Sequence, residues 1–488
     1  MKSLRLNTPL LTNALVGLTS LGLAACAAVG PDYQTPPPEA PPQWSRIDTT
    51  EPSITNPGAT GDLSTWWKKL NDPLLSELIN EALQASPDLR SAQARLREAR
   101  ARRTVAAAGR VPSVDAAASA NRNNPSEEVG GGATRDLYRA GFDASWELDV
   151  FGGVRRAVEA AEANFESSQA SLDATRVSLA AEVASGYIEV RAQQSLLDIS
   201  RANLESQSET LQLTDWRAQA GLVSIQDVEQ ARSSREQTRA QIPFIQTSLA
   251  EAEHGLDVLL GRTPGTLHPR LAVAAGLPEV PRQVAVGIPA DTLRQRPDVR
   301  AAERTLAAET ARVGVAEAAR YPNFTLSGSI GLEALTLGAL GNSGATASSL
   351  SGSVTAPIFD AGRLRALVEI QDAVREQALV AYEQTVLGAL QEAENALVDL
   401  ARNRESGEAL SNAAESARTA AELARERYSA GLIDFQPVLS SQRSVLTLEE
   451  TLARNRANGV LALIRLYKAL GGGWSPQAEP LATSKDTP

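Results

Sequence analysis

The sequence is poor in the residues that build disulfides and metal sites. Its 488 residues include one cysteine, one methionine and two histidines. A single cysteine excludes an intrachain disulfide framework. His254 and His268 lie in no pattern of zinc ligands, and the only methionine is the initiator, so thioether ligands for copper(I) are missing. We therefore expect no metal and no cofactor, and a copper-export role is disfavoured.

Sequence motifs for catalysis are also missing. The glycine runs at 130–132 and 471–473 do not belong to a phosphate-binding loop, so turns are the better interpretation. No serine lies in a nucleophile elbow. The formal net charge of −11 argues against a nucleic-acid partner. We expect a protein that is not an enzyme and binds no nucleic acid.

Long apolar runs are missing beyond the N-terminus, and a membrane-spanning helix needs about 20 such residues. The first residues have a basic start and an apolar stretch over 10–25, which is the layout of a secretory signal peptide. Residues 23–26 read Leu-Ala-Ala-Cys and resemble a bacterial lipoprotein box, in which the chain is cut before an acylated cysteine. We predict that residues 1–25 are removed and that Cys26 carries lipid.

The sequence does contain one pattern twice. Pro-Asp-Leu-Arg at 87–90 recurs as Pro-Asp-Val-Arg at 297–300, an offset of 210 positions. The same offset relates Pro112 to Pro322, Gly152 to Gly362, and Ala-Gly-Leu at 220–222 to Ala-Gly-Leu at 430–432. Chance matches do not hold one offset over such a length, so the chain is a duplicated unit.

Each copy is predicted to contain a helix, two strands, a very long helix and a further helix. The first helix of the first copy is expected to begin at Pro87 with Ser86 as its capping residue. The expected domains are a signal peptide (1–25), an extended segment (26–70), the first repeat (71–265), a linker (266–296), the second repeat (297–474) and a tail (475–488). The repeats are divided into strand hairpins (112–150, 322–360), long helices (153–220, 363–430) and final helices (225–260, 436–470).

The strand candidates alternate between apolar and polar residues. This alternation over about ten residues is typical of a membrane β-strand with one face toward lipid. A half-buried strand of an ordinary sheet would alternate too, but four such segments in two hairpins favour the membrane. The side chains predicted to face lipid are Phe142, Trp146, Leu148, Leu326, Ile330 and Val354.

The two long helices are free of proline and could each approach roughly 100 Å. Their small apolar residues favour lateral packing as coiled coils. Four strands cannot close a barrel, and open strand edges are not tolerated in lipid, so several chains must pool their strands. Two chains would pool 8 strands and three would pool 12, and three are favoured because only a larger barrel leaves room for a lumen. The predicted fold class is therefore mixed α and β: a trimeric outer-membrane β-barrel with four strands per protomer, continuous with a long periplasmic α-helical barrel and built from an internal two-fold repeat.

Further motifs carry a resemblance that spans nearly the whole mature chain. They are VGPDY at 29–33, WW at 66–67 with DPL at 72–74, LLGRTPG at 259–265, RPDVRAAE at 296–303 and YKALGGGW at 467–474. With these motifs the sequence is similar to the TolC/OprM-type outer-membrane factors, in the NodT-like efflux lipoprotein branch. The resemblance implies a homotrimer in outer-membrane lipid that docks to a periplasmic adaptor (membrane fusion protein) and an inner-membrane pump.

The function expected from the residues and the resemblance is that of a passive duct. It would be the outer-membrane channel of a tripartite, RND-type efflux system that exports drugs or other small molecules. It would be lipid-anchored in the outer membrane of a Gram-negative bacterium and extend into the periplasm. Two alternatives remain: a duct of the same family for type I protein secretion, and a periplasmic coiled-coil adaptor without membrane strands.

The two Ala-Gly-Leu turns are expected at the periplasmic mouth of the tunnel, a long helix away from the strands. Charged and polar groups beside them would form rings around a trimer axis and hold the mouth closed. The resemblance places Tyr428 and Asp227 in the constriction network, and Ser440 stands where relatives often carry an acidic residue. The predicted gate and adaptor-contact residues are Asp215, Arg217, Gly221, Leu222, Asp227, Arg427, Tyr428, Gly431, Leu432, Asp434 and Ser440.

Overall fold

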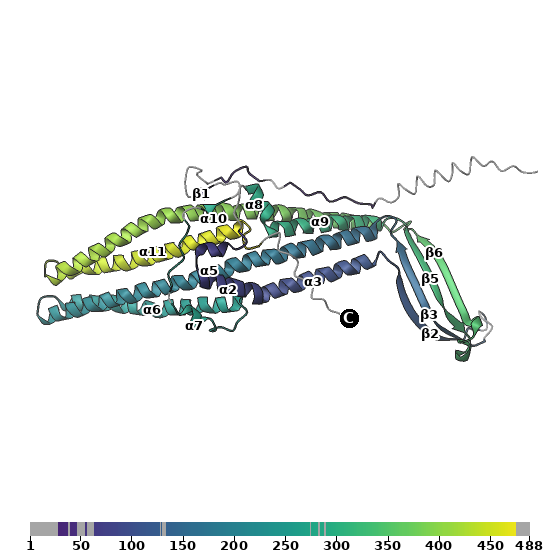
Figure 1. Cartoon of the computed structure of the whole chain (residues 1–488), viewed down its shortest axis with the longest axis horizontal. Helices are drawn as coiled ribbons and strands as arrows, with labels where there is room; N and C mark the ends of the chain where they lie inside the picture. Colours follow the sequence, from purple (N-terminus) through teal and green to yellow (C-terminus); the bar gives the residue numbers. More distant parts are fainter. Residues whose placement is uncertain are drawn as a thin grey trace, which may run out of the picture. The chain divides into compact units, whose positions relative to one another are not determined.

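Two similar series of helices and strands make up most of the computed structural model (Figure 1). The structure describes residues 28–37, 40–45, 54–55, 63–126, 128, 133–273, 275–281, 284–286 and 289–474. The predicted signal peptide, Cys26 and the tail at 475–488 lie outside these residues.

The halves repeat element by element. The first half contains α3 (Pro87–Ala108), β2 (Ser113–Asn123), β3 (Arg135–Leu148), α5 (Gly153–Gln219) and α6 (Ile225–Leu259). The second contains α9 (Pro297–Ala318), β5 (Asn323–Ala334), β6 (Thr346–Thr355), α10 (Arg363–Ser429) and α11 (Phe435–Ala469). Both long helices have 67 residues and both final helices have 35, so the duplication seen in the sequence extends to element lengths.

Shorter elements precede or connect these halves. They are β1 (Ile54–Thr55), η1 (Trp66–Leu70), α2 (Pro73–Ala85), α7 (His268–Leu271), β4 (Val284–Ala285), α8 (Pro289–Gln295), η2 (Leu337–Ala339) and η3 (Ser343–Ala345). Helix α3 begins at Pro87 as predicted, but the capping role of Ser86 was wrong. Among the described residues, the buried Ser86 hydroxyl has no hydrogen-bond partner. None of the described helices combines the length and apolar character needed to cross a membrane.

The chain divides into two compact units. Unit 1 comprises residues 1–37, 95–169 and 301–383, and unit 2 comprises 38–94, 170–300 and 384–488. Helices α5 and α10 each contribute to both units because the boundaries fall inside them.

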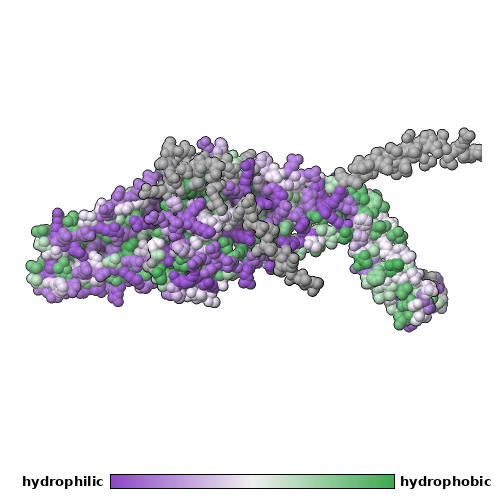
Figure 2. Space-filling model, viewed as in Figure 1, coloured by the Kyte–Doolittle hydropathy of each residue, from purple (hydrophilic) through white to green (hydrophobic). Residues whose placement is uncertain are grey.

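Unit 1 contains one antiparallel sheet with the strand order β2-β3-β5-β6. Residues directly opposite each other on antiparallel strands share a face of the sheet. Phe142 pairs with Ile330 and Trp146 with Leu326, so the predicted apolar set lies on one face. Val354 joins this face through its pairing with Phe324. Figure 2 shows hydrophobic residues along these strands.

The opposite face of the sheet is polar. It carries Asp143 and Ser329, which are paired across β3 and β5. The hydroxyls of Ser329 and Ser349 lie 2.8 Å apart on the same face. The alternation read from the sequence is therefore confirmed as a two-faced sheet, and the two predicted hairpins are joined side by side through β3 and β5.

Unit 2 is built on two helical hairpins, in which α6 returns along α5 and α11 returns along α10 (Figure 1). The Trp-Trp motif lies in its core: Trp66 is fully buried and stacks on Tyr467 with ring centroids 5.3 Å apart. The Tyr187 hydroxyl donates to Asp72 Oδ2 at 2.6 Å. Burial raises the pKa of Tyr187 to about 12, so this donor keeps its proton at neutral pH.

The two-faced sheet predicts unequal effects of arginine at neighbouring positions of β5. Ile330→Arg places a cation on the apolar face and should cost about 2–4 kcal/mol near the middle of a bilayer. Ser329→Arg faces Asp143 and should be tolerated. Urea unfolding of the protein folded into lipid vesicles measures the difference. Equal unfolding midpoints for the two variants would show that the apolar face is not the lipid face.

Candidate functional site at the helical hairpin tips

Both long helices end in the same hydrogen-bonded cap. Gly221 and Gly431 have φ values of +74°, in the left-handed region that favours glycine. The Leu222 N–H donates to the Arg217 carbonyl at 2.8 Å, and the Leu432 N–H donates to the Arg427 carbonyl at 2.9 Å. This is the Schellman arrangement, which satisfies carbonyls at a helix end. The prediction that glycine terminates each helix is confirmed.

The two return helices begin differently. Ser224 and Asp227 form a capping box at the start of α6, in which the Asp227 carboxylate accepts from the Ser224 N–H at 3.1 Å. Asp434 is the residue before α11, in the place that Ser224 has before α6, but its side chain makes no capping hydrogen bond. Asp227 is therefore engaged in its own helix start, whereas the Asp434 carboxylate is available to another group.

Arg217 connects the first tip to the second tip of the same chain. Its guanidinium lies over the Tyr428 ring, with Cζ 4.5 Å from the ring centroid, and Nη1 donates to the Tyr428 carbonyl. A cation at a helix C-terminus is favoured by the helix dipole, and stacking on an aromatic ring adds a further attraction. Within the described part of the chain, the buried Arg217 Nε has no hydrogen-bond partner.

Tyr428 is the centre of the tip core. Its side chain is 1% exposed, and its ring lies 5.7 Å from that of Phe435. The hydroxyl reaches Thr214 Oγ1 only at 3.4 Å, which is long for a hydrogen bond. The other buried members of the cluster are Ala231, Ala424, Val438 and Leu439. Tyr428 thus holds two hairpins of one chain together through its ring more than through its hydroxyl.

Polar contacts extend this connection along the hairpins. Arg425 and Glu209 form an ion pair at 3.0 Å, and Gln442 Nε2 donates to Thr210 Oγ1 at 2.7 Å. Because Thr210 is buried, the hydrogen bond from Gln442 satisfies its hydroxyl inside the pair of hairpins. Sequence reasoning missed Thr210, Thr214 and Phe435. The sequence shows how far these residues lie from the tip glycines, but it does not show which residues of the other hairpin they contact.

The remaining predicted tip residues are surface groups of the single chain. Asp215 accepts from Gln219 within α5 at 2.8 Å, and the Ser440 hydroxyl donates to the Pro437 carbonyl at 3.1 Å. Arg427 is exposed and makes no side-chain hydrogen bond or ion pair with any described residue. Leu222 and Leu432 are 67% and 73% exposed. Of the predicted set, the structure brings together Arg217 and Tyr428.

Metal ligands do not gather at the tips or elsewhere in the described residues, where no group of three or more His, Cys, Asp or Glu side chains could hold a metal ion.

The family model described as "Outer membrane efflux protein" matches residues 78–262 and 288–472, which are the two repeats. The chain belongs to this family. It is 33% identical over 457 residues to nodulation protein T of Rhizobium leguminosarum bv. viciae, covering 93% of this chain and 92% of the relative. It is 31% identical over 465 residues to the solvent efflux pump outer membrane protein SrpC of Pseudomonas putida, covering 93% of this chain and 97% of the relative.

Solved structures agree with this assignment. The outer-membrane channel OprN superposes with a TM-score of 0.86 at 37% identity, covering 92% of this chain and all of that chain. A structure of CusC superposes with a TM-score of 0.78 at 28% identity, covering 92% and 100%. The predicted fold class is confirmed: the efflux protein is a mixed α and β protomer with repeated halves, as in trimeric channels with a β-barrel and an α-helical barrel.

The tip core predicts that the ring and the hydroxyl of Tyr428 contribute unequally to local stability. Tyr428→Ala should cost about 3–5 kcal/mol because a buried ring is lost. Tyr428→Phe should cost less than about 1 kcal/mol because the hydroxyl has only a long contact. Amide hydrogen exchange of peptides from both tips measures the effect. Arg232→Ala, at an exposed arginine of α6 that pairs with Glu229, is the control, and comparable deprotection by Tyr428→Phe and Tyr428→Ala would refute the assignment.

Proposed function

We propose that this efflux protein is a passive export duct, the outer-membrane channel of a tripartite, RND-type system for drugs or other small molecules. The observation that carries the proposal is the sheet of unit 1. Its apolar face is exposed in the single chain, with Ile330 61% and Phe142 56% exposed. Strands β2 and β6 each pair on one side only among the described strands. Such edges are tolerated in lipid only when neighbouring chains complete the barrel.

Three copies are the proposed assembly, consistent with the trimeric channels of the family. Each copy contributes four strands and two repeated helical halves, so the tube would have approximate six-fold symmetry in its helical part. The proposed partners are a periplasmic adaptor and an inner-membrane pump. We propose no enzymatic activity for the chain, since energy for transport would enter at the pump and the duct would only conduct.

The gate is proposed at the hairpin tips. Arg217 and Tyr428 form a buried contact inside one chain, which keeps its two hairpins together. Asp215, Arg427, Asp434 and Ser440 lie at the surface of the tips and are the groups proposed to meet neighbouring chains. Leu222 and Leu432 would offer apolar contacts to the adaptor. Opening would then separate chains from one another without separating the hairpins of one chain.

Conductance in planar bilayers tests the duct and its gate. The wild-type trimer should give discrete current steps. The double substitution of Arg427→Ala and Asp434→Ala removes two proposed contacts between chains, so its conductance should rise. Cells producing it should also become more sensitive to vancomycin, which is too large for a closed mouth.

Arg232→Ala is the control, because among the described residues this exposed arginine on α6 pairs only with Glu229 of its own helix. Normal trimers of the double variant with wild-type conductance and wild-type vancomycin sensitivity would remove these residues from the gate. Trimers of the wild type that pass no current under any condition would count against the duct itself.

A further inference from the structure

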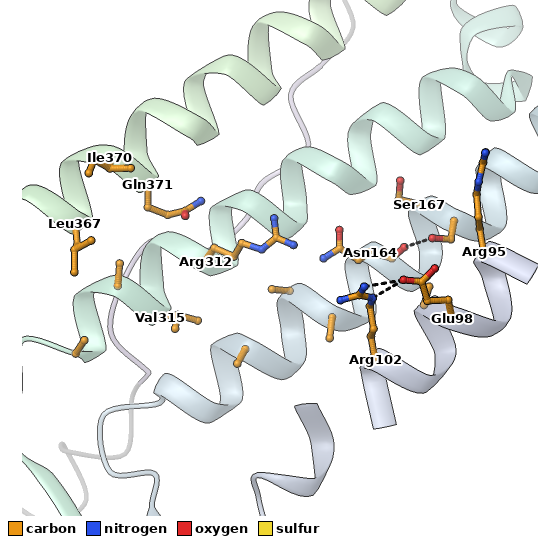
Figure 3. Close-up of a pocket in the computed structure, with 17 residues that line it drawn as sticks. Arg95, Glu98, Arg102, Asn164, Ser167, Arg312, Val315, Leu367, Ile370 and Gln371 are labelled. Atoms are coloured by element: carbon orange, nitrogen blue, oxygen red, sulfur yellow. Dashed lines mark hydrogen bonds and ion pairs between the residues drawn. The ribbon is translucent and has the colours of Figure 1, made fainter. Parts of the chain in front are cut away.

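A groove in unit 1 combines an apolar floor with an arginine-rich rim. It has a volume of about 840 Å³ and is lined by residues of α3, α5, α9 and α10 (Figure 3). Val315, Leu367 and Ile370 contribute to the floor, together with several alanines. Three arginines and one glutamate are the charged residues of the lining: Arg95, Arg102, Arg312 and Glu98. The groove is therefore locally cationic in a chain whose net charge is −11.

Two of the three arginines of the groove, Arg95 and Arg102, are available to a ligand, whereas Arg312 is held by an ion pair. Arg102 Nη2 and Glu98 Oε1 lie 2.7 Å apart, but both side chains are more than half exposed, so the pair is weak and exchanges readily with solvent. Arg312 pairs with Glu309, whose other oxygen accepts from Gln371 at 2.8 Å. Arg95 is exposed and has no ion pair or side-chain hydrogen bond with any described residue.

The two-fold repeat places two of these arginines at equivalent positions. Arg102 and Arg312 are separated by the same offset of 210 that relates the halves. Their helices, α3 and α9, each have 22 residues, and each arginine lies six residues before the helix end. In a tube with approximate six-fold symmetry, equivalent residues lie at the same level around the axis. Copies of Arg102 and Arg312 would therefore form one ring.

The groove lies on a different side of the helices from the N-terminal strap, residues 28–37. The strap contacts α9 through Tyr33, whose hydroxyl donates to Glu303 at 2.9 Å, and through Gly30, which leaves no room for a Cβ against Gly314. At 3.6 residues per turn, Glu303 and Gly314 lie about a third of a turn from Val315 and nearly half a turn from Arg312. Because the strap follows the predicted lipid anchor, its side would face the outside of the proposed tube, and the groove side would face the lumen.

We infer that this groove is a transit site for amphipathic organic anions, and that its arginine ring gives the duct a preference for anions. The inference rests on the proposed duct and adds the class of cargo. An apolar body fits against the floor, and a carboxylate or sulfonate accepts hydrogen bonds from the guanidinium groups. Rings of charged side chains set the charge preference of a pore in this way.

The test uses purified wild-type trimer and the triple variant Arg95→Gln, Arg102→Gln and Arg312→Gln in planar bilayers. The reversal potential in a KCl gradient gives the ratio of chloride to potassium permeability. We expect the triple variant to lower this ratio by roughly twofold or more. Cholate, an amphipathic carboxylate, should block wild-type current at a lower concentration than it blocks the variant. A quaternary-ammonium detergent should not show this difference.

Arg97→Gln is the matched control. Arg97 is an exposed arginine of the same helix, does not line the groove and lies about half a turn from Arg95. Arg95→Gln alone guards against misfolding, because it removes no ion pair or side-chain hydrogen bond within the described chain, and it should shift both readouts in the same direction.

Conducting variants with the permeability ratio and cholate block of Arg97→Gln would overturn the inference and leave the duct standing. A change in permeability ratio without a change in cholate block would overturn the transit site. A wild-type protein without current would instead fail the proposed duct.

Discussion

Unpaired backbone groups at the two edges of the four-stranded sheet impose the constraint on which the rest of the structure depends. An N–H or C=O without a partner costs several kcal/mol in hydrocarbon, so a sheet of this kind cannot stand alone in a membrane. Pairing of β2 with β6 of a neighbouring chain removes both edges and creates a closed wall. The need for several copies follows from this closure, and the exposed apolar face of the single chain is consistent with it.

The two halves of the chain have equivalent helices, but the side chains at their tips differ. The long helices of the two halves are equal in length and share the same glycine cap. Their tips differ in side chains: Arg217 of the first half stacks on Tyr428, whereas its equivalent, Arg427, is exposed. One arginine therefore stabilises the chain internally, and the other is the one that we propose to contact a neighbouring chain. In unit 1, by contrast, the equivalent positions 102 and 312 are both arginines that line the same groove.

The repeat, the helix ends and the sheet faces could be predicted because they depend on local patterns. Glycine after each long helix indicated the left-handed cap at Gly221, and alternation indicated which side Ile330 shares with Phe142. Alternation does not select partners, so the direct pairing of β3 with β5 was not predicted. Other features depend on packing between segments far apart in the sequence. These are the burial of Tyr428, the Ser86 hydroxyl without a hydrogen-bond partner among the described residues, and the groove beside Arg312. Periodicity in one segment contains no information on such packing.

The central claim is that closure of the sheet requires several copies of this chain in one tube. Native mass spectrometry of protein extracted from the outer membrane in detergent tests it directly, and denaturing the same sample gives the mass of each chain. We predict a complex of three chains, each beginning at Cys26 and increased in mass by acyl groups. A stable single chain in the native spectrum would contradict closure between chains, and unmodified N-termini would separately contradict lipidation at Cys26.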